Sequence, residues 1–140
     1  MTTVPTPESL KIKIFADGAD LDGMRELYAK PYIKGFTTNP TLMRKAGVSD
    51  YKAFALEVLN EIPDRPVSFE VFADEFDEME GQALEITSWG KNVNIKIPIT
   101  NTKGASSAAL VERLSKQGVV VNVTAMFTLE QTREITDILD

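Results

Sequence analysis

The sequence predicts an α/β protein built from β/α units with parallel strands. Short apolar segments of strand type alternate with segments whose apolar residues recur at helical spacing. The alternation occurs five times, and no fixed-period repeat or low-complexity linker interrupts it. One strand segment, Val93–Thr100, is rich in β-branched residues and carries a single lysine among apolar neighbours.

Composition bounds the class of protein. We expect residues 1–10 to form an N-terminal tail and residues 11–140 to form one domain. The net charge of -6 argues against a nucleic-acid partner, and no apolar run approaches the roughly 20 residues that span a bilayer. The tail has neither a positive n-region nor an apolar h-region, so no secretory signal is visible. The absence of cysteine excludes disulfides and thiol catalysis and fits a cytoplasmic protein.

Histidine is also absent. Its absence excludes Ser-His-Asp and Cys-His catalytic machinery and nearly every zinc site of the usual type. Lysine, aspartate and glutamate are therefore the side chains left for proton transfer.

The first half of the chain predicts two strands with their helices. The strands alternate apolar and polar residues, and the helices have apolar residues three and four positions apart. Asp20 stands near the start of the first helix, and Ser49 or Asp50 caps a later one. In order, the expected elements are a strand over 11–16, a helix over 19–30 before Pro31, a strand over 35–38, a short helix from Asn39 to Gly47, and a helix from residue 51 that stops before Pro63.

The second half predicts three further β/α units. In the strands over 67–72 and 119–124 we expect the odd-numbered apolar positions to face the helices. Thr128 is the expected cap of the last helix, with Leu129, Ile135, Ile138 and Leu139 facing inward. In order, the elements are strands over 67–72, 93–100 and 119–124, helices over 74–89 and 106–117, and the helix after Thr128.

The lysine strand has two different faces. Asn94, Lys96 and Pro98 share one face, and the three isoleucines share the other. An ammonium group seldom enters a protein interior unless it is paired or neutralised, because desolvation favours the uncharged amine. A neutral amine is a nucleophile, so Lys96 is a candidate catalytic residue.

Polar residues recur on the same face near the carboxyl ends of several strands: Asp17, Glu70, Lys96, Asn122 and Thr124. In an open doubly wound sheet this face would also have to be apolar. In a barrel it points into the lumen, where polar groups at the carboxyl ends of the strands form the active site. The polar face therefore favours a barrel.

Each of these residues, taken singly, also allows a purely structural interpretation. A strand lysine is often an edge residue whose head reaches solvent, and a strand glutamate usually lies on a solvated face. Asn39-Pro40 is a common turn, and Asn122 with Thr124 could simply end a strand. The functional interpretation depends on the recurrence of the residues at equivalent strand ends.

Four segments together resemble the transaldolase family in order and spacing. They are Lys13–Asp17, Gly35–Leu42, Asn94–Thr100 and Asn122–Phe127. The run Thr-Thr-Asn-Pro and the strand with Lys-Ile-Pro form a specific combination, and the resemblance covers nearly the whole chain from Lys11 onward. It implies a TIM-type (β/α)8 barrel, represented here by about five β/α units.

The resemblance also implies a role for each candidate residue. Lys96 is the lysine that forms a Schiff base with a ketose phosphate, and Glu70 is the acid/base residue that works through a water with Thr124. Asp17 takes the proton of the C4 hydroxyl during cleavage and returns it when the new aldehyde is joined. The implied substrate-binding residues are Thr38, Asn39 and Asn122.

The implied activity is transfer of a dihydroxyacetone unit from a ketose phosphate to an aldose phosphate, as in the pentose phosphate pathway, without a metal or an organic cofactor. Related fructose-6-phosphate aldolases carry glutamine at the position of Glu70, so the glutamate favours transaldolase over simple aldol cleavage. Two alternatives remain, a fructose-6-phosphate aldolase and an inactive barrel remnant that acts as a structural or interaction module.

The chain departs from the family in length, because a (β/α)8 barrel typically needs about 250 residues. The sixth to eighth strands are missing, and with them the serine and arginine that bind the substrate's hydroxyl and phosphate in the family. A fragment, a natural short gene product and a half-barrel completed by another chain are all compatible with this. Unpaired strand edges need cover, so we expect a homo-oligomer or completion by another chain.

Overall fold

The computed structural model describes residues 4–139; residues 1–3 of the expected tail, and Asp140, lie outside the described residues. Its five strands follow the order of the chain, β1-β2-β3-β4-β5, and alternate with helices. Contacts divide the chain into two compact units, Met1–Val67 and Ser68–Asp140. The predicted α/β class, with about five of the units of a (β/α)8 barrel, is confirmed. One domain over 11–140 stays a prediction.

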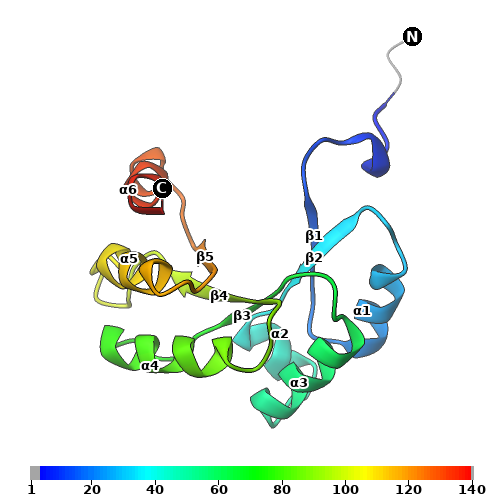
Figure 1. Cartoon of the computed structure of the whole chain (residues 1–140), viewed down its shortest axis with the longest axis horizontal. Coiled ribbons are helices and arrows are strands. Elements are labelled where there is room, and N and C mark those ends of the chain that lie inside the picture. The colour runs from blue at the N-terminus through cyan, green and yellow to red at the C-terminus, as the bar shows by residue number, and fades with distance from the viewer. Residues whose placement is uncertain (1–3, 140) are drawn as a thin grey trace. The chain divides into compact units, whose positions relative to one another are not determined.

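The first unit contains one parallel strand pair and its helices (Figure 1). The caps confirm two expectations, because Asp20 accepts a hydrogen bond from Gly23 N–H at 2.9 Å and Asp50 accepts one from Ala53 N–H at 2.9 Å. Asp50, rather than Ser49, is therefore the cap of α3. The elements are η1 (Pro7–Ser9), β1 (Ile14–Asp17), α1 (Leu21–Tyr28), β2 (Ile33–Thr37), α2 (Pro40–Lys45) and α3 (Tyr51–Glu61).

The β1–β2 pair has a tight contact on the face that carries Asp17. Phe15 and Gly35 are register partners, and a Cβ atom at Gly35 would collide with the ring of Phe15. Only glycine leaves room for that ring. On the opposite face Ala16 and Phe36 are buried, so the core lies between this face and the helices.

The second unit contains the lysine strand. β4 pairs in parallel with β5, and the backbone N–H of Val71 at the end of β3 donates to Lys96 O at 3.2 Å. Thr128 Oγ1 accepts a hydrogen bond from Gln131 N–H at 3.2 Å and so caps α6 as predicted. The elements are β3 (Val67–Glu70), whose first residue belongs to the first unit, α4 (Phe76–Thr87), β4 (Val93–Pro98), α5 (Ala108–Lys116), β5 (Val121–Thr124) and α6 (Leu129–Leu139).

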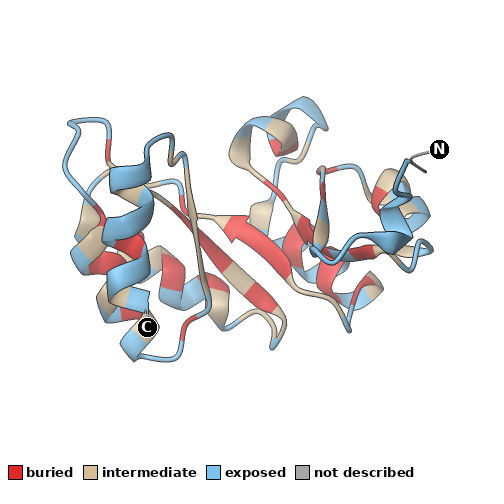
Figure 2. Ribbon diagram, turned by 90° about the horizontal axis from the view of Figure 1, so that it is seen from above, coloured by how far each residue is buried: buried red, intermediate tan, exposed pale blue. Residues whose placement is uncertain are grey.

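Buried residues in these strands stand at consecutive positions, not only at alternate ones (Figure 2). Ser68 between Val67 and Phe69 is fully buried, and β5 is half-buried throughout. Phe69, Ile95 and Ile97 are fully buried, and the edge of the Phe69 ring meets Trp89 with ring centroids 6.4 Å apart. The amphipathic α5 covers this core with its own fully buried side chains, including Leu114. Phe69 packs on Trp89, just after α4, as predicted for the odd positions of β3, whereas Val121 and Val123, the odd positions of β5, are only half-buried.

One burial prediction is wrong. On α6, Ile135 is buried, but Leu129 is 70% exposed and Leu139 is 40% exposed. Leu129 precedes Ile135 by six residues, which places it about 120° around the helix from the buried stripe. Leu139 is the last residue of the helix. The face of α6 that packs on α5 is therefore narrower than predicted.

The helices in residues 4–139 are also too short, or too polar, for any of them to cross a lipid bilayer.

Candidate active site

Lys96 forms an ion pair with Glu70 in the second unit. Its Nζ lies 3.4 Å from Glu70 Oε2, and the two side chains are 11% and 20% exposed. The residues flanking Lys96, Ile95 and Ile97, are fully buried and point to the opposite face. A cation removed from water in this way needs a partner, and the carboxylate supplies one. Lys96 is therefore largely buried and paired in this unit, and its role as a catalytic residue stays a prediction.

Asn122 lies on the same face as the ion pair. It is the register partner of Lys96 in the β4–β5 pair, and register partners point to the same side of a sheet. Its Nδ2 donates a hydrogen bond to Ser68 Oγ at 3.2 Å. Ser68 is completely buried and stands two residues before Glu70 on β3. Three neighbouring strands therefore place a lysine, a carboxylate, an amide and a hydroxyl on one face.

Thr124 ends β5 on this face. It is the register partner of Pro98, and its carbonyl accepts a hydrogen bond from Ile99 N–H at 2.9 Å. The next residue, Ala125, has φ = 60°, a left-handed conformation that is uncommon for a residue with a side chain. The backbone thus turns away immediately after Thr124, which leaves its half-buried side chain at the end of the strand.

The other predicted residues belong to the first unit. Asp17, at the exposed end of β1, accepts a hydrogen bond from Thr37 Oγ1 at 2.8 Å. Asn39 is the cap of α2, because its Oδ1 accepts a hydrogen bond from Leu42 N–H at 2.9 Å. Thr38 is completely buried. The structure therefore gives Asn39 a local structural role and leaves Thr38 without exposed surface.

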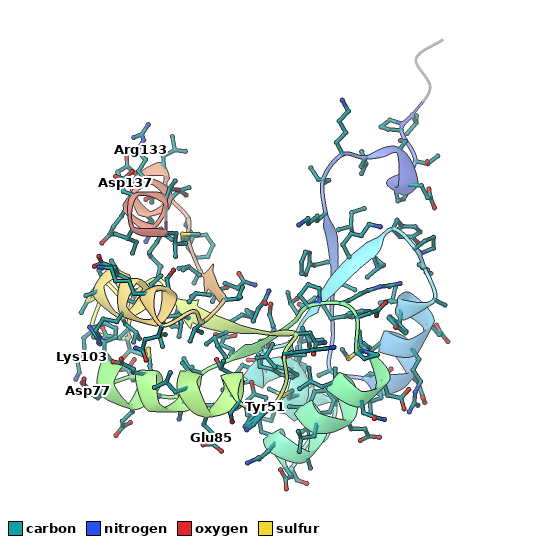
Figure 3. The ribbon with its side chains drawn as sticks, viewed as in Figure 1. Tyr51, Asp77, Glu85, Lys103, Arg133 and Asp137 are labelled. Carbon is teal, nitrogen blue, oxygen red and sulfur yellow. The ribbon has the colours of Figure 1, made fainter. Side chains whose placement is uncertain are left out.

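A pair of loops is fastened together at the carboxyl ends of β3 and β4. Asp74 accepts hydrogen bonds from the N–H and the Oγ1 of Thr102, both at 2.7 Å. These two hydrogen bonds, the backbone one first, hold the pKa of Asp74 below its usual range. The adjacent Lys103 forms an ion pair with Glu75, and Figure 3 shows Lys103 and Asp77 of α4 at the same end of this unit. The loops that follow Glu70 and Lys96 are thereby held together.

The geometry on the strand face suits amine chemistry. Lys96 is an amine with a carboxylate 3.4 Å away, so a proton can pass between the two groups. The side chains of Asn122 and Thr124 can bind hydroxyl groups. Within residues 4–139, no three carboxylates gather as metal ligands would.

Comparison with known proteins identifies the family. The model of the transaldolase/fructose-6-phosphate aldolase family matches residues 14–138. The chain belongs to this family. The family includes proteins named probable transaldolase that are 38% identical over 120 residues in Dehalococcoides mccartyi, 42% over 123 residues in Streptococcus agalactiae, and 40% over 120 residues in a Thermoanaerobacter species.

The three alignments cover 86% of this chain but only 53–54% of each relative. The chain thus spans about half the length of the curated relatives it matches. The family resemblance predicted from the sequence is therefore confirmed.

Three residues that the sequence analysis did not single out form hydrogen bonds at or beside the candidate site. Ser68 bonds Asn122, Thr37 bonds Asp17, and Asp74 joins the two loops. Alternation along β3 places Ser68 on the same face as Glu70, and alternation along β2 places Thr37 on the face opposite to Phe36. Ser68 and Thr37 could therefore have been predicted from the sequence. Asp74 could not, because its partner Thr102 is 28 residues away and lies in a loop.

Proposed function

We propose that this chain contributes the Schiff-base half of a transaldolase site, which transfers a dihydroxyacetone unit from a ketose phosphate to an aldose phosphate. The observation that carries the proposal is the buried Lys96–Glu70 pair, in a chain that belongs to the transaldolase/fructose-6-phosphate aldolase family. An amine beside a proton acceptor is what attack on a ketone requires.

In the proposed reaction, Glu70 first takes a proton from the Lys96 ammonium. The amine nitrogen then bonds to the ketone carbon, and the carbinolamine oxygen leaves as water after it is protonated, with Glu70 as the nearby acid. The product is an iminium. Its positive nitrogen accepts the electron pair of the C3–C4 bond, so that bond breaks to give an enamine and an aldehyde. The reverse steps join the enamine to the acceptor aldehyde.

The remaining roles rest on the family resemblance. Asp17 takes the C4 hydroxyl proton during cleavage, and its hydrogen bond from Thr37 holds the carboxylate in place. Thr124 holds the water through which Glu70 works. Thr38, Asn39 and Asn122 bind the donor sugar. The reaction is assigned to the pentose phosphate pathway and to the cytoplasm on the same basis.

Fructose-6-phosphate aldolase is the alternative that the family description also names. The two activities differ in the need for an acceptor. A transaldolase releases product from fructose 6-phosphate only when an aldose phosphate is present, whereas an aldolase releases free dihydroxyacetone without one. Glu70, where aldolases of this type have glutamine, favours the transferase. Product analysis with and without erythrose 4-phosphate separates the two.

Reduction with borohydride in the presence of fructose 6-phosphate tests the proposal. We expect a covalent sugar adduct on Lys96, identified by peptide mass spectrometry. Lys96→Met should abolish the adduct and keep the fold, because a long apolar side chain fits the same position on the strand. Lys103→Met is the matched control: Lys103 is also an ion-paired lysine of the second unit, but its side chain is 67% exposed, so trapping should persist.

Absence of an adduct on the native chain would favour the inactive structural module. An adduct that survives Lys96→Met would show that the nucleophile is another residue.

We also propose that the chain associates with a second copy. Apolar side chains are exposed around β5, the last strand of the sheet, and α6, the helix that follows it. Val120 is 58% exposed, Phe127 90% and Leu129 70%. Contact with another copy would remove this surface from water. Analytical ultracentrifugation at micromolar concentration should give a dimer or a larger assembly. A single monomeric species would contradict the proposal.

A further inference from the structure

The hydrogen bond between Asn122 and Ser68 joins strands that are not neighbours. In the strand order β4 lies between β3 and β5, and Asn122 is directly opposite Lys96 of β4. Adjacent strands are about 4.8 Å apart, so β3 and β5 are separated by roughly 9–10 Å. An asparagine and a serine bridge this distance only when both side chains lean over β4 from the same face. The bond at 3.2 Å therefore crosses the strand that carries the lysine.

The buried partner in this bond is Ser68. Its relative exposure is 0%, whereas Asn122 is only partly buried. A completely buried hydroxyl on a strand has a fixed place, so it can act as an anchor for the more accessible amide. The bond also determines the orientation of that amide. Because Nδ2 is directed at Ser68, Oδ1 is the atom that Asn122 presents elsewhere.

We propose that Ser68 is a positioning residue for the sugar site. Its hydroxyl holds Asn122 Nδ2, so that Asn122 Oδ1 accepts a hydrogen bond from a hydroxyl group of the donor ketose while that sugar is bound to Lys96. This inference rests on the proposed function for its ligand. Its geometric part, the fixed orientation of the amide, does not.

The geometric part is tested first in the sugar-free chain. In nuclear magnetic resonance spectra we expect the side-chain N–H protons of Asn122 to exchange slowly with water, and to exchange faster in Ser68→Ala. Equal exchange rates in the two proteins would overturn the inference, whether or not the chain binds sugar.

The ligand part is tested by borohydride trapping over a range of fructose 6-phosphate concentrations. Loss of one orienting hydrogen bond should raise the half-saturating concentration about 3- to 10-fold in Ser68→Ala, while the maximal yield of the Lys96 adduct stays the same. A matched control is Ser107→Ala. Ser107 is equally buried in the same unit, but its hydroxyl donates to the carbonyls of Pro98 and Ile99, so the half-saturating concentration should not change.

A double-mutant cycle separates positioning from general support of the fold. If Ser68 acts through Asn122, Ser68→Ala should have no further effect on half-saturation when Asn122 is already alanine. An additive effect would overturn the inference, as would an unchanged half-saturation in the single variant. Absence of trapping in the native chain would instead contradict the proposed function, and the exchange measurement would still decide the role of Ser68.

Discussion

The two units of the chain have similar cores but different polar faces. Each has a fully buried aromatic residue on a strand, Phe36 in the first unit and Phe69 in the second. The carboxylate of the first unit, Asp17, is exposed and bonded to Thr37. The second unit holds Lys96 and Glu70 largely out of water.

Burial decides how strongly the stability of each unit depends on its charged side chains. Charges at exposed sites interact weakly because water screens them, whereas a desolvated pair depends strongly on both of its members. We therefore expect the stability of the second unit to depend on its candidate catalytic residues, Lys96 and Glu70. Asp17 of the first unit is exposed, so its replacement should leave the stability of the fold almost unchanged.

The largest expected effect tests the similarity of the cores. Phe36→Ala and Phe69→Ala each remove a fully buried ring, and each should lower the free energy of unfolding by about 3–5 kcal/mol. Urea denaturation followed by circular dichroism measures both losses. A loss confined to one variant would show that only one of the two cores is well packed.

The second prediction tests the contrast between the polar faces. Glu70→Gln leaves the Lys96 ammonium without its carboxylate and should lower the free energy of unfolding by ~1–3 kcal/mol. Asp17→Asn changes an exposed carboxylate and should stay within about 0.5 kcal/mol of the native value. Urea denaturation at neutral pH provides the comparison. Equal losses would mean that burial of the pair has no energetic consequence.

The smallest expected effect concerns pH and salt. Hydrogen bonds from Thr102 lower the pKa of Asp74, and the Arg25 guanidinium, through its hydrogen bonds first, lowers the pKa of Glu61. Because both pKa values are lower in the folded state, both contributions are complete above the ordinary carboxyl values near 4 and disappear as pH falls through the lowered values. Asp74→Asn and Glu61→Gln should each make stability less dependent on pH in that acid range.

Salt distinguishes these two carboxylates. Glu61 forms an ion pair with Arg25, so about 0.5 M salt should reduce the difference in stability between the native protein and Glu61→Gln. Asp74 is bonded mainly to the neutral N–H and hydroxyl of Thr102, so its contribution should change less. Urea midpoints at low and high salt measure both differences. An equal response to salt would contradict the assignment of different partners.

The sequence predicted the fold class and the order of the elements because those depend on local patterns. Alternation in β3 and β4, helical spacing in α5, and caps such as Asp20 and Thr128 are properties of a few neighbouring residues. Strand ends were less accurate: β3 stops at Glu70 and β4 at Pro98, each two residues before the predicted end. Pairing with a neighbouring strand decides where a strand stops, and the sequence does not show that neighbour.

The sequence was enough to predict that Lys96, Glu70, Asn122 and Thr124 point to one face, and to show the resemblance to the transaldolase family. Parity along a strand and a specific motif are both readable without coordinates. Which of these groups are in contact depends on the folded structure. The 3.4 Å approach of Lys96 to Glu70, the bond of Asn122 to Ser68 and the exposure of Leu129 each depend on register and helix packing between segments distant in the chain.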